Sequence, residues 1–324
     1  MPHDVLPQLP SDIVWVNGNF VQRSMLNGNP SPRAIHYQNS VFDGMLARKN
    51  GGEWDIFAVR KYLTRLVTSA QRAGIVRTPE VPNAPELMYT VPKLKEVCYE
   101  LLRLNPNNPY IRPWISLDSG FLGVSMPSDG SAFVMVEALS LGEYYPNETL
   151  SVYITEKHRR PSDALSYIDA KGAGSTYNIG LRVLAEAESH GCDDALLCYR
   201  VDGELYIAEH SSTSNIFFAG GRVVVPKRTG TFLYGINIQL AIHLAKQCNM
   251  PLDIRPIRLS ELYDKRLDAA LAIGTAGGWK PIATYKTPLG REIPMDVNNA
   301  MMKALIGKRN EVIQIKGYDF PYTP

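Results

Sequence analysis

The chain has 324 residues, of which 45% are apolar and 20% are charged, and its formal net charge is +2. This composition is ordinary for a globular protein, and so small a net charge argues against a strongly basic surface for nucleic acid or acidic membranes. The longest apolar runs fall short of the roughly 20 residues that cross a membrane, and the first residues lack the basic-then-apolar pattern of a signal peptide, so we expect a cytoplasmic protein.

The first part of the sequence mixes strand and helix patterns. Hydropathy alternates around Asn17-Gly18, a dipeptide typical of a type I′ hairpin. Further on, apolar residues recur at i, i+3 and i+4 from Val59 until Gly74, which predicts an amphipathic helix. The predicted elements are a hairpin at 14–22, extended chain at 34–49, helices at 59–73 and 91–104, and a strand at 110–117.

The second part is richer in strands. Two pairs of apolar runs turn at Asp202-Gly203 and at Gly220-Gly221, which predicts two hairpins. The predicted elements are strands at 150–154 and 166–168, a helix at 178–190, hairpin strands at 194–199, 204–209, 215–219 and 222–226, a helix at 238–248, a strand at 252–257, a short helix from Ser260 and a strand at 269–274.

Glycine, proline and tyrosine concentrate between Gly142 and Asn147, as they do in linkers. We therefore predict a small domain over residues 1–141, a linker over 142–149 and a larger, cofactor-binding domain over 150–324.

Several familiar catalytic motifs are absent from the sequence. Gly172-x-Gly174 lacks the third glycine of a dinucleotide fingerprint, and there is no P-loop, H-E-x-x-H or G-x-S-x-G motif. The six histidines are isolated and the four cysteines form no C-x-x-C pair, so we predict no metal site and free thiols.

Lys171 is the residue that calls for explanation, because it lies between an apolar run and a loop with two glycines. Glu209 ends a predicted strand, and the turns at Gly235-Ile236-Asn237 and Gly274-Thr275-Ala276 offer backbone N–H groups suited to phosphate. An amine, a carboxylate and a phosphate cradle are what pyridoxal phosphate requires. Taken singly, each residue fits an ordinary surface or turn position better than a place in a cofactor site.

Seven segments taken together resemble the branched-chain aminotransferase family of pyridoxal-phosphate enzymes, and they follow the family's order over most of the chain. They are HYQNSVFDG (36–44), FAVRKYLTRL (57–66), YIRPWI (110–115), DAKGAGSTY (169–177), YIAEHSSTSNIFF (206–218), YGINIQLA (234–241) and IGTAGGWKPI (273–282). The resemblance implies the fold type IV architecture: an α/β fold of the α+β type, with a smaller N-terminal α/β domain and a larger C-terminal domain on a β-barrel-like sheet.

The resemblance also implies roles at the cofactor. Lys171 would be the Schiff-base lysine and proton carrier, and Glu209 would pair with the pyridinium nitrogen. Tyr177 would bond the phenolic oxygen. Arg60 would bind the phosphate, because its fork suits that group, together with Ile236, Asn237 and Thr275.

Substrate contacts follow from the same resemblance. Tyr110 and the amides of Thr275 and Ala276 match positions that hold the α-carboxylate. Tyr37, Phe42 and Arg112 match a wall that takes either an apolar side chain or the distal carboxylate of glutamate, although Tyr37 and Phe42 fit a strand core equally well. Tyr144 or Tyr145, with Tyr145 preferred, would contribute from the linker.

The sequence departs from the family pattern at a few positions. Tyr177 follows Lys171 by six residues instead of five, and one extra residue separates Glu209 from Asn215. Gln38 replaces a glycine, and Asn237 replaces a threonine.

The expected reaction is transamination between a branched-chain-like L-amino acid, or a specialised biosynthetic substrate, and a 2-oxo acid such as 2-oxoglutarate. The expected assembly is a homodimer, without nucleic acid or membrane partners. The alternatives within the fold are a transaminase for D-amino acids or (R)-amines and a lyase of the aminodeoxychorismate type. The alternative of another class is a non-catalytic scaffold protein, and the presence of both Lys171 and Glu209 argues against it.

Overall fold

The computed structural model describes residues 9–26, 32–118, 126, 130–142, 144–161, 170–174 and 178–323. The chain divides into two compact units. The N-terminal unit comprises Val5–Gly142, Ala170–Ser175 and Thr323–Pro324, and the C-terminal unit comprises Met1–Asp4, Glu143–Asp169 and Thr176–Tyr322. The short segment that carries Lys171 therefore belongs to the N-terminal unit, although its neighbours in sequence on both sides belong to the other.

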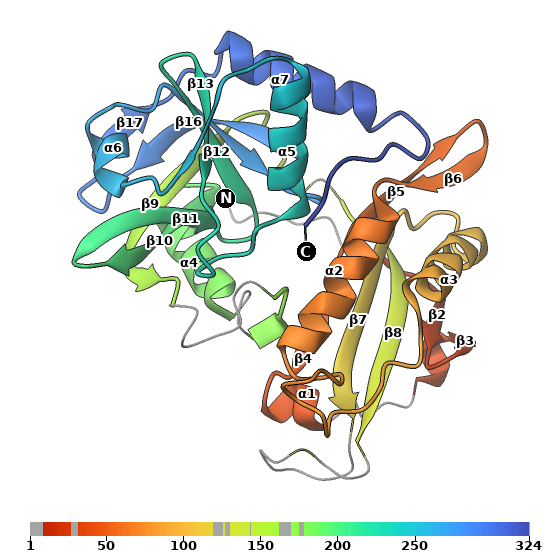
Figure 1. Ribbon diagram of the computed structural model, residues 1–324. Helices are drawn as coiled ribbons and strands as arrows, with labels where there is room; N and C mark the ends of the chain where they lie inside the picture. The colour runs from red at the N-terminus through yellow and green to blue at the C-terminus, as the bar shows by residue number, and fades with distance from the viewer. Residues whose placement is uncertain are drawn as a thin grey trace. The chain divides into compact units, whose positions relative to one another are not determined.

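The N-terminal unit is built on one sheet of eight described strands (Figure 1). The main path of the sheet runs β3-β2-β8-β7-β5-β6, with β1 beside β8 and β4 beside β7, and every pairing is antiparallel. The strands are β1 (Leu9–Pro10), β2 (Ile13–Val16), β3 (Asn19–Gln22), β4 (Ser40–Phe42), β5 (Met45–Asn50), β6 (Glu53–Ile56), β7 (Tyr110–Asp118) and β8 (Ser131–Ser140).

Two long helices, α2 (Val59–Arg72) and α3 (Val91–Leu104), pack against each other and against this sheet. Both bury the apolar stripe that the sequence predicts, because Leu63, Leu66, Leu94 and Leu101 are inaccessible to water. The Thr90 hydroxyl caps α3 by accepting from the Lys93 N–H at 3.3 Å. A short 3₁₀ helix (Arg23–Met25) and α1 (Pro32–His36) complete the unit.

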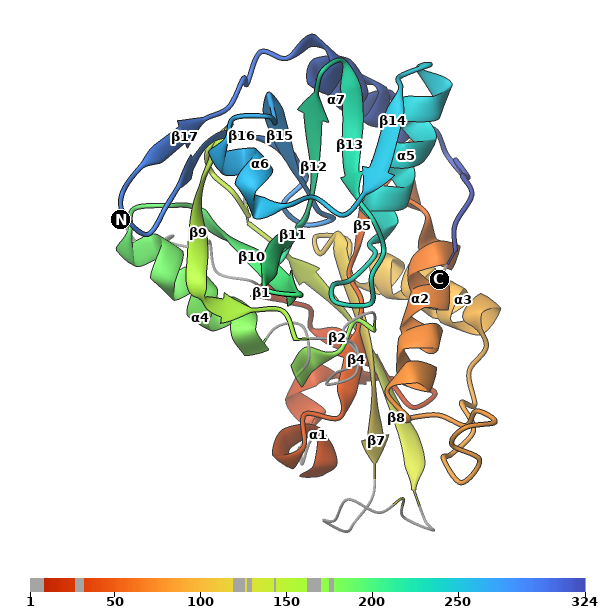
Figure 2. The same ribbon diagram turned by 60° about the vertical axis from the view of Figure 1, so that its left-hand side comes forward.

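The C-terminal unit is built on a nine-stranded mixed sheet with the path β11-β10-β9-β16-β15-β12-β13-β14, and with β17 beside β16. The sheet curls so that β11, at one end of the path, also contacts β12 (Figure 2). The strands are β9 (Leu150–Arg159), β10 (Asp194–Val201), β11 (Glu204–His210), β12 (Ser214–Ala219), β13 (Arg222–Pro226), β14 (Leu252–Arg255), β15 (Ala269–Ile273), β16 (Trp279–Lys286) and β17 (Glu292–Pro294).

Four helices accompany this sheet: α4 (Asn178–Ser189), α5 (Ile236–Gln247), α6 (Leu259–Tyr263) and α7 (Ala300–Val312). Helix α4 packs on β9 and β10, while α5 packs on β12, β13, β14 and α7 (Figures 1 and 2). A hydrophobic cluster of the unit includes Phe217, Tyr285, Leu196, Ile282 and Leu262. No helix in the described part of the chain is long and apolar enough to cross a membrane.

The sequence predictions hold for α2, α3, the first hairpin and the two hairpins of the C-terminal unit, and they fail in two kinds of place. The extended chain predicted at 34–49 is interrupted: α1 occupies its start, and Gln38, with φ of 54°, breaks the strand direction before β4. Strands β8, β16 and β17 and helix α7 were not predicted. The strand predicted at 166–168 lies outside the described residues.

Candidate active site

The segment that carries Lys171 is fixed to the N-terminal unit by main-chain bonds. The N–H of Lys171 donates to the hydroxyl of Ser69 on α2 at 3.0 Å, and its carbonyl accepts from the N–H of Phe42 on β4 at 3.1 Å. Gly172 forms a bridge with Val41 in the same strand. The lysine is thus held at the edge of β4 and beside α2, with its amine 5.2 Å from the centre of the Phe42 ring.

The amine of Lys171 has a lowered pKa. The pKa of this amine is lowered from 10.5 to about 8. Burial is the largest cause, the positive charges of Arg65 and, to a smaller extent, Arg112 add to the shift, and Asp43 and Tyr110 oppose it. At pH 8 about half of the molecules therefore carry the uncharged amine, the form that acts as a base or nucleophile. A surface lysine is almost entirely charged at that pH.

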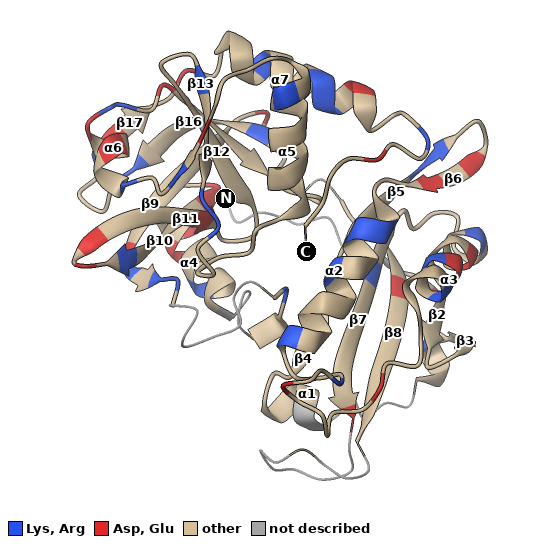
Figure 3. Ribbon diagram, in the orientation of Figure 1, with Lys and Arg blue, Asp and Glu red and all other residues tan. Residues whose placement is uncertain are grey.

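Arg65 and Asp43 form a buried, bidentate ion pair close to this amine. The Nε of Arg65 donates to Oδ2 of Asp43 at 2.9 Å and Nη2 donates to Oδ1 at 2.7 Å, while Oδ1 also accepts from the N–H of Gly44 at 2.8 Å. Helix α2 carries basic residues and no acidic one (Figure 3), so the acid has to come from elsewhere, namely from the loop after β4. The guanidinium keeps its positive charge within this pair, and a guanidinium fork suits anions such as phosphate.

Arg60, the arginine predicted to bind phosphate, is exposed on the first turn of α2. Arg65 is the arginine whose charge acts on Lys171. The sequence reasoning missed it because Arg65 lies within the apolar stripe of the helix, where a charge is unexpected. The position of Arg65 in the sequence could have identified it, because an arginine in a buried apolar stripe requires a partner of opposite charge.

Three predicted substrate-contact residues come together in this unit: Phe42 and Arg112 of the predicted wall, and Tyr110, which was predicted at the α-carboxylate. The guanidinium carbon of Arg112 lies 4.8 Å from the ring centre of Phe42 and 5.4 Å from that of Tyr110, and Nη2 of Arg112 donates to the Tyr110 hydroxyl at 3.2 Å. The Tyr110 hydroxyl fills the space beside Gly44, where a Cβ atom would lie only 1.8 Å from it. The result is an aromatic wall with one cation over both rings.

Tyr37 and Gln38 lie on the approach to β4. Tyr37 is 45% exposed, and the centre of its ring lies 6.4 Å from that of His36 in α1. Gln38, at the position where the resembling family has glycine, packs its side chain against Gly174: a Cβ on that glycine would lie 2.5 Å from Oε1 of Gln38. The loop after Lys171 is therefore shaped by a glutamine side chain.

In the C-terminal unit, Glu209 is buried near the end of β11 and forms an ion pair with Arg160, with Nη2 of the arginine 2.9 Å from Oε1 of the glutamate. The next residue, His210, opens a tight turn: its N–H donates to the Thr213 carbonyl at 2.8 Å, and its Nδ1 is 3.1 Å from the Thr213 hydroxyl. Sequence reasoning found the acid and missed its arginine.

The predicted phosphate turns meet in the same unit. Asn237, in the first turn of α5, donates from Nδ2 to the Thr275 hydroxyl at 3.2 Å, and its Oδ1 accepts from Nε1 of Trp279 at 2.9 Å. The amide that replaces a threonine in this sequence thus links the start of α5 to the loop after β15. Ile236 is buried beside it, and Ala276 follows Thr275 in the half-exposed part of that loop.

Tyr145, the predicted contact from the linker, is buried in the C-terminal unit. Its hydroxyl bonds the buried carboxylate of Asp194, and burial together with that charge raises the pKa of the phenol well above its usual value. Tyr144 is the more exposed of the two and donates to the Ser212 hydroxyl at 2.8 Å. Tyr145 thus packs in the core of the unit, and a substrate contact from Tyr144 or Tyr145 stays a prediction. Tyr177 lies outside the described residues.

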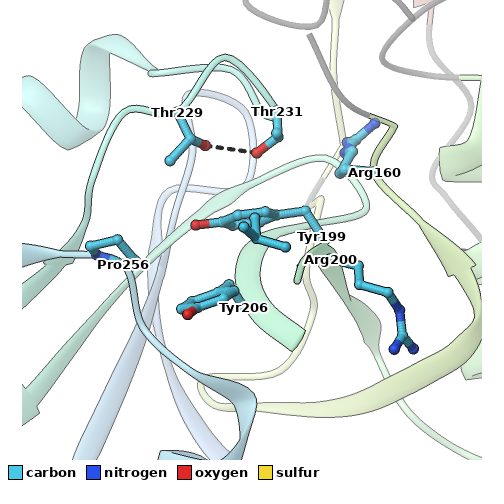
Figure 4. Close-up of a pocket in the computed structure, with 8 residues that line it drawn as sticks. Arg160, Tyr199, Arg200, Tyr206, Thr229, Thr231 and Pro256 are labelled. Atoms are coloured by element: carbon cyan, nitrogen blue, oxygen red, sulfur yellow. Dashed lines mark hydrogen bonds between the residues drawn. The ribbon is translucent and has the colours of Figure 1, made fainter. Parts of the chain in front are cut away.

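Among the described residues, no cluster of histidine, cysteine, aspartate and glutamate is arranged to hold a metal ion. One cavity of about 350 Å³ lies in the C-terminal unit, lined in part by the stacked rings of Tyr199 and Tyr206 and the hydroxyls of Thr229 and Thr231 (Figure 4). In Figure 4 the guanidinium of Arg160 points away from the two rings.

Comparisons with known proteins agree on one family. The model of the amino-transferase class IV family matches residues 40–285. The "Probable branched-chain-amino-acid aminotransferase" of Staphylococcus aureus (strain N315) is 28% identical over 297 residues, which cover 89% of this chain and 80% of that protein.

Solved structures show the same fold. The branched-chain aminotransferase from Thermoproteus uzoniensis with norvaline superposes with a TM-score of 0.81 at 23% identity, covering 95% of this chain and 96% of the other. The branched-chain amino acid aminotransferase from Thermobaculum terrenum in its PLP-form gives a TM-score of 0.79 at 20% identity, covering 94% of both chains. The predicted fold type IV architecture is thereby confirmed.

Proposed function

The chain belongs to the class IV aminotransferase family, and on that premise we propose that it binds pyridoxal 5′-phosphate and moves an amino group between an L-amino acid with a branched-chain-like side chain and a 2-oxo acid such as 2-oxoglutarate. The observation that carries the proposal is the amine of Lys171, whose pKa is lowered to about 8 beside a buried arginine. An uncharged lysine amine is what both attachment of the cofactor and proton transfer require.

The residues present fit this cofactor. Lys171 supplies the amine, and Arg65 supplies a guanidinium that Asp43 orients through two hydrogen bonds. Glu209 supplies a buried carboxylate for the ring nitrogen. We therefore assign the phosphate to Arg65 in place of Arg60.

The remaining donors would come from the start of α5 and from the loop after β15. The backbone N–H groups of Ile236 and Asn237 lie in the first turn of α5, where the helix dipole favours an anion. The hydroxyl of Thr275 lies within 3.2 Å of Asn237 Nδ2, so these groups form one polar cluster. Tyr177 remains our candidate for the phenolic oxygen.

Each residue would then have a separate task. When bound, the cofactor supplies an electron sink that acidifies the α-carbon of an attached amino acid. Lys171 would hold and return the proton, which its lowered pKa allows near neutral pH. Glu209 would keep a positive charge on the ring nitrogen by pairing with it.

The proposed substrate follows from the wall of the N-terminal unit. Phe42 and Tyr110 present aromatic surface to an apolar side chain, and Arg112 lies over both rings, where it can meet a carboxylate. One site could thus accept a branched-chain donor and a dicarboxylic acceptor in turn. The names of the relative and of the solved structures support this substrate class. Tyr37, Tyr144 and Ala276 are proposed further contacts.

The test is a panel of amino donors, each assayed with 2-oxoglutarate for both the keto product and glutamate. The proposal predicts that leucine, isoleucine and valine are the best donors and that the two products form in equal amounts. Keto product without consumption of 2-oxoglutarate would point to a lyase. Preference for D-amino acids or (R)-amines would overturn the substrate assignment. The variant Lys171→Ala should lose transaminase activity.

A further inference from the structure

Arg160 and Glu209 form the most deeply buried ion pair among the described residues of the C-terminal unit. Their side chains are 1% and 6% exposed, and Nη2 of Arg160 lies 2.9 Å from Oε1 of Glu209. The N–H of Arg160 donates to the Cys198 carbonyl at 2.9 Å, which fixes the arginine to β10. A pair so deep carries a large desolvation cost, and each charge needs the other to be tolerated there.

Two irregularities in the sheet bring these residues together. Along β10, the register with β9 jumps from Ile154 opposite Leu196 to Arg159 opposite Cys198, so extra residues of β9 lie unpaired between them. At the same point, the register with β11 jumps from His210 to Ile207, which leaves Glu209 in a bulge on the other side. Bulges re-aim side chains, and here the long side chains of Arg160 and Glu209 meet from the two strands that flank β10.

Arg160 also borders the cavity next to the ion pair, but its guanidinium points away from the stacked tyrosine rings there (Figure 4). The ring centres of Tyr199 and Tyr206 lie 5.5 Å apart, and their packing is satisfied without the cation. The guanidinium of Arg160 is thus oriented towards the carboxylate of Glu209.

We propose that Arg160 is a positioning residue that holds Glu209 as the anion and aims its carboxylate at the ring nitrogen of the cofactor. The proposal rests on the proposed function. A carboxylate that is buried alone takes up a proton, and a protonated Glu209 could no longer stabilise a positive ring nitrogen. Because a carboxylate accepts hydrogen bonds at both oxygens, the contact of Oε1 with Arg160 is compatible with a second bond to the ring.

The experiment follows the proton on the ring nitrogen directly, with pyridoxal phosphate labelled with ¹⁵N in the ring. Arg160→Lys keeps the positive charge and Arg160→Met removes it. Arg159→Met is the matched control, because it removes the charge of the neighbouring arginine, which donates to the carbonyls of Thr155 and His158. In the native protein, in Arg160→Lys and in Arg159→Met, the ¹⁵N shift should be that of a protonated pyridine. In Arg160→Met it should move to the value of free cofactor at high pH, with kcat lower on the order of 10²-fold.

An unchanged ring shift in Arg160→Met would overturn the proposal, as would an equal change in Arg159→Met. If Arg160→Met does not fold, Arg160→Gln replaces it, because an amide keeps an N–H donor near Glu209 and removes the positive charge. The ring nitrogen of that variant should again be unprotonated, and a protonated one would refute the inference.

A readout without cofactor separates this inference from the proposed function. In the apo-protein, the thermal midpoint should fall in Arg160→Met and recover in part when Glu209→Gln is added, because the unpaired buried carboxylate is gone. If the native protein binds no pyridoxal phosphate, the proposed function fails. If it binds and the ring nitrogen of Arg160→Met stays protonated, only the role of Arg160 fails.

Discussion

The amine of Lys171 gives the sharpest quantitative prediction, and Arg65→Met is the perturbation that tests it. Burial is the largest cause of the lowered pKa and is unaffected by the substitution, whereas the repulsion from Arg65 is removed and the buried charge of Asp43 loses its partner. Both changes favour the charged amine. The pKa of Lys171 should therefore rise from about 8 and stay below 10.5.

The size of the effect follows from the pKa itself. A fall from 10.5 to about 8 corresponds to about 3 kcal/mol of preference for the uncharged amine, at 1.36 kcal/mol per tenfold change. At pH 7.5 the uncharged fraction of Lys171 should exceed that of a surface lysine by on the order of 10²-fold. The same lysine opposes folding below pH 8, and this penalty should disappear as the pH rises towards 10.5, because the unfolded chain binds the extra proton.

Competitive acetylation of the apo-protein at limiting reagent, read by mass spectrometry from pH 6 to 11, measures this midpoint. The native chain should give a midpoint near 8 and Arg65→Met a higher one. Arg72→Met, which removes a cation from the last turn of the same helix, should leave the midpoint unchanged. A native midpoint near 10.5, or an equal shift in the two variants, would refute the electrostatic reasoning.

Three further predictions concern packing and burial. Gly44→Ala places a methyl group 1.8 Å from the Tyr110 hydroxyl, so the free energy of unfolding should fall by about 1–3 kcal/mol in urea titrations; an unchanged midpoint would mean that the ring moves aside freely. Asn237→Ala removes the acceptor of the Trp279 N–H and a bond to the loop after β15, which should cost about 1–2 kcal/mol in the same assay. Burial raises the pKa of Cys98 to about 12, so its thiol should resist alkylation at pH 8 until urea unfolds the chain, and rapid labelling of the folded protein would contradict this.

The local hydropathy pattern predicted helices and strands correctly where one face of the element is buried. Helices α2 and α3 carry clear stripes, and the hairpin turns have glycine where φ is positive, as at Gly203 and Gly221. The same pattern missed elements that are buried on both faces and elements that bury only a few side chains. Strand β8 reads SAFVMVEALS, an apolar run without alternation, and α7 buries only Met302, Leu305 and Val312.

Sequence patterns identified only part of the candidate site. Lys171, Glu209 and Asn237 were identified because their segments resemble a known family. Arg65 and Arg160 were missed, since each is important through a partner distant in sequence: Asp43 lies 22 positions before Arg65, and Glu209 lies 49 positions after Arg160. Such pairs depend on strand register and bulges, which a single sequence does not encode locally.

The central claim is that Lys171 carries the cofactor of a transaminase. Borohydride reduction of the protein reconstituted with pyridoxal phosphate, followed by peptide mapping, tests it most directly. The account predicts one equivalent of reduced cofactor on the peptide that contains Lys171, and its loss when leucine is added before the borohydride, because the amino donor displaces the lysine. Attachment to other lysines, or a protein that remains colourless and unlabelled, would contradict the account.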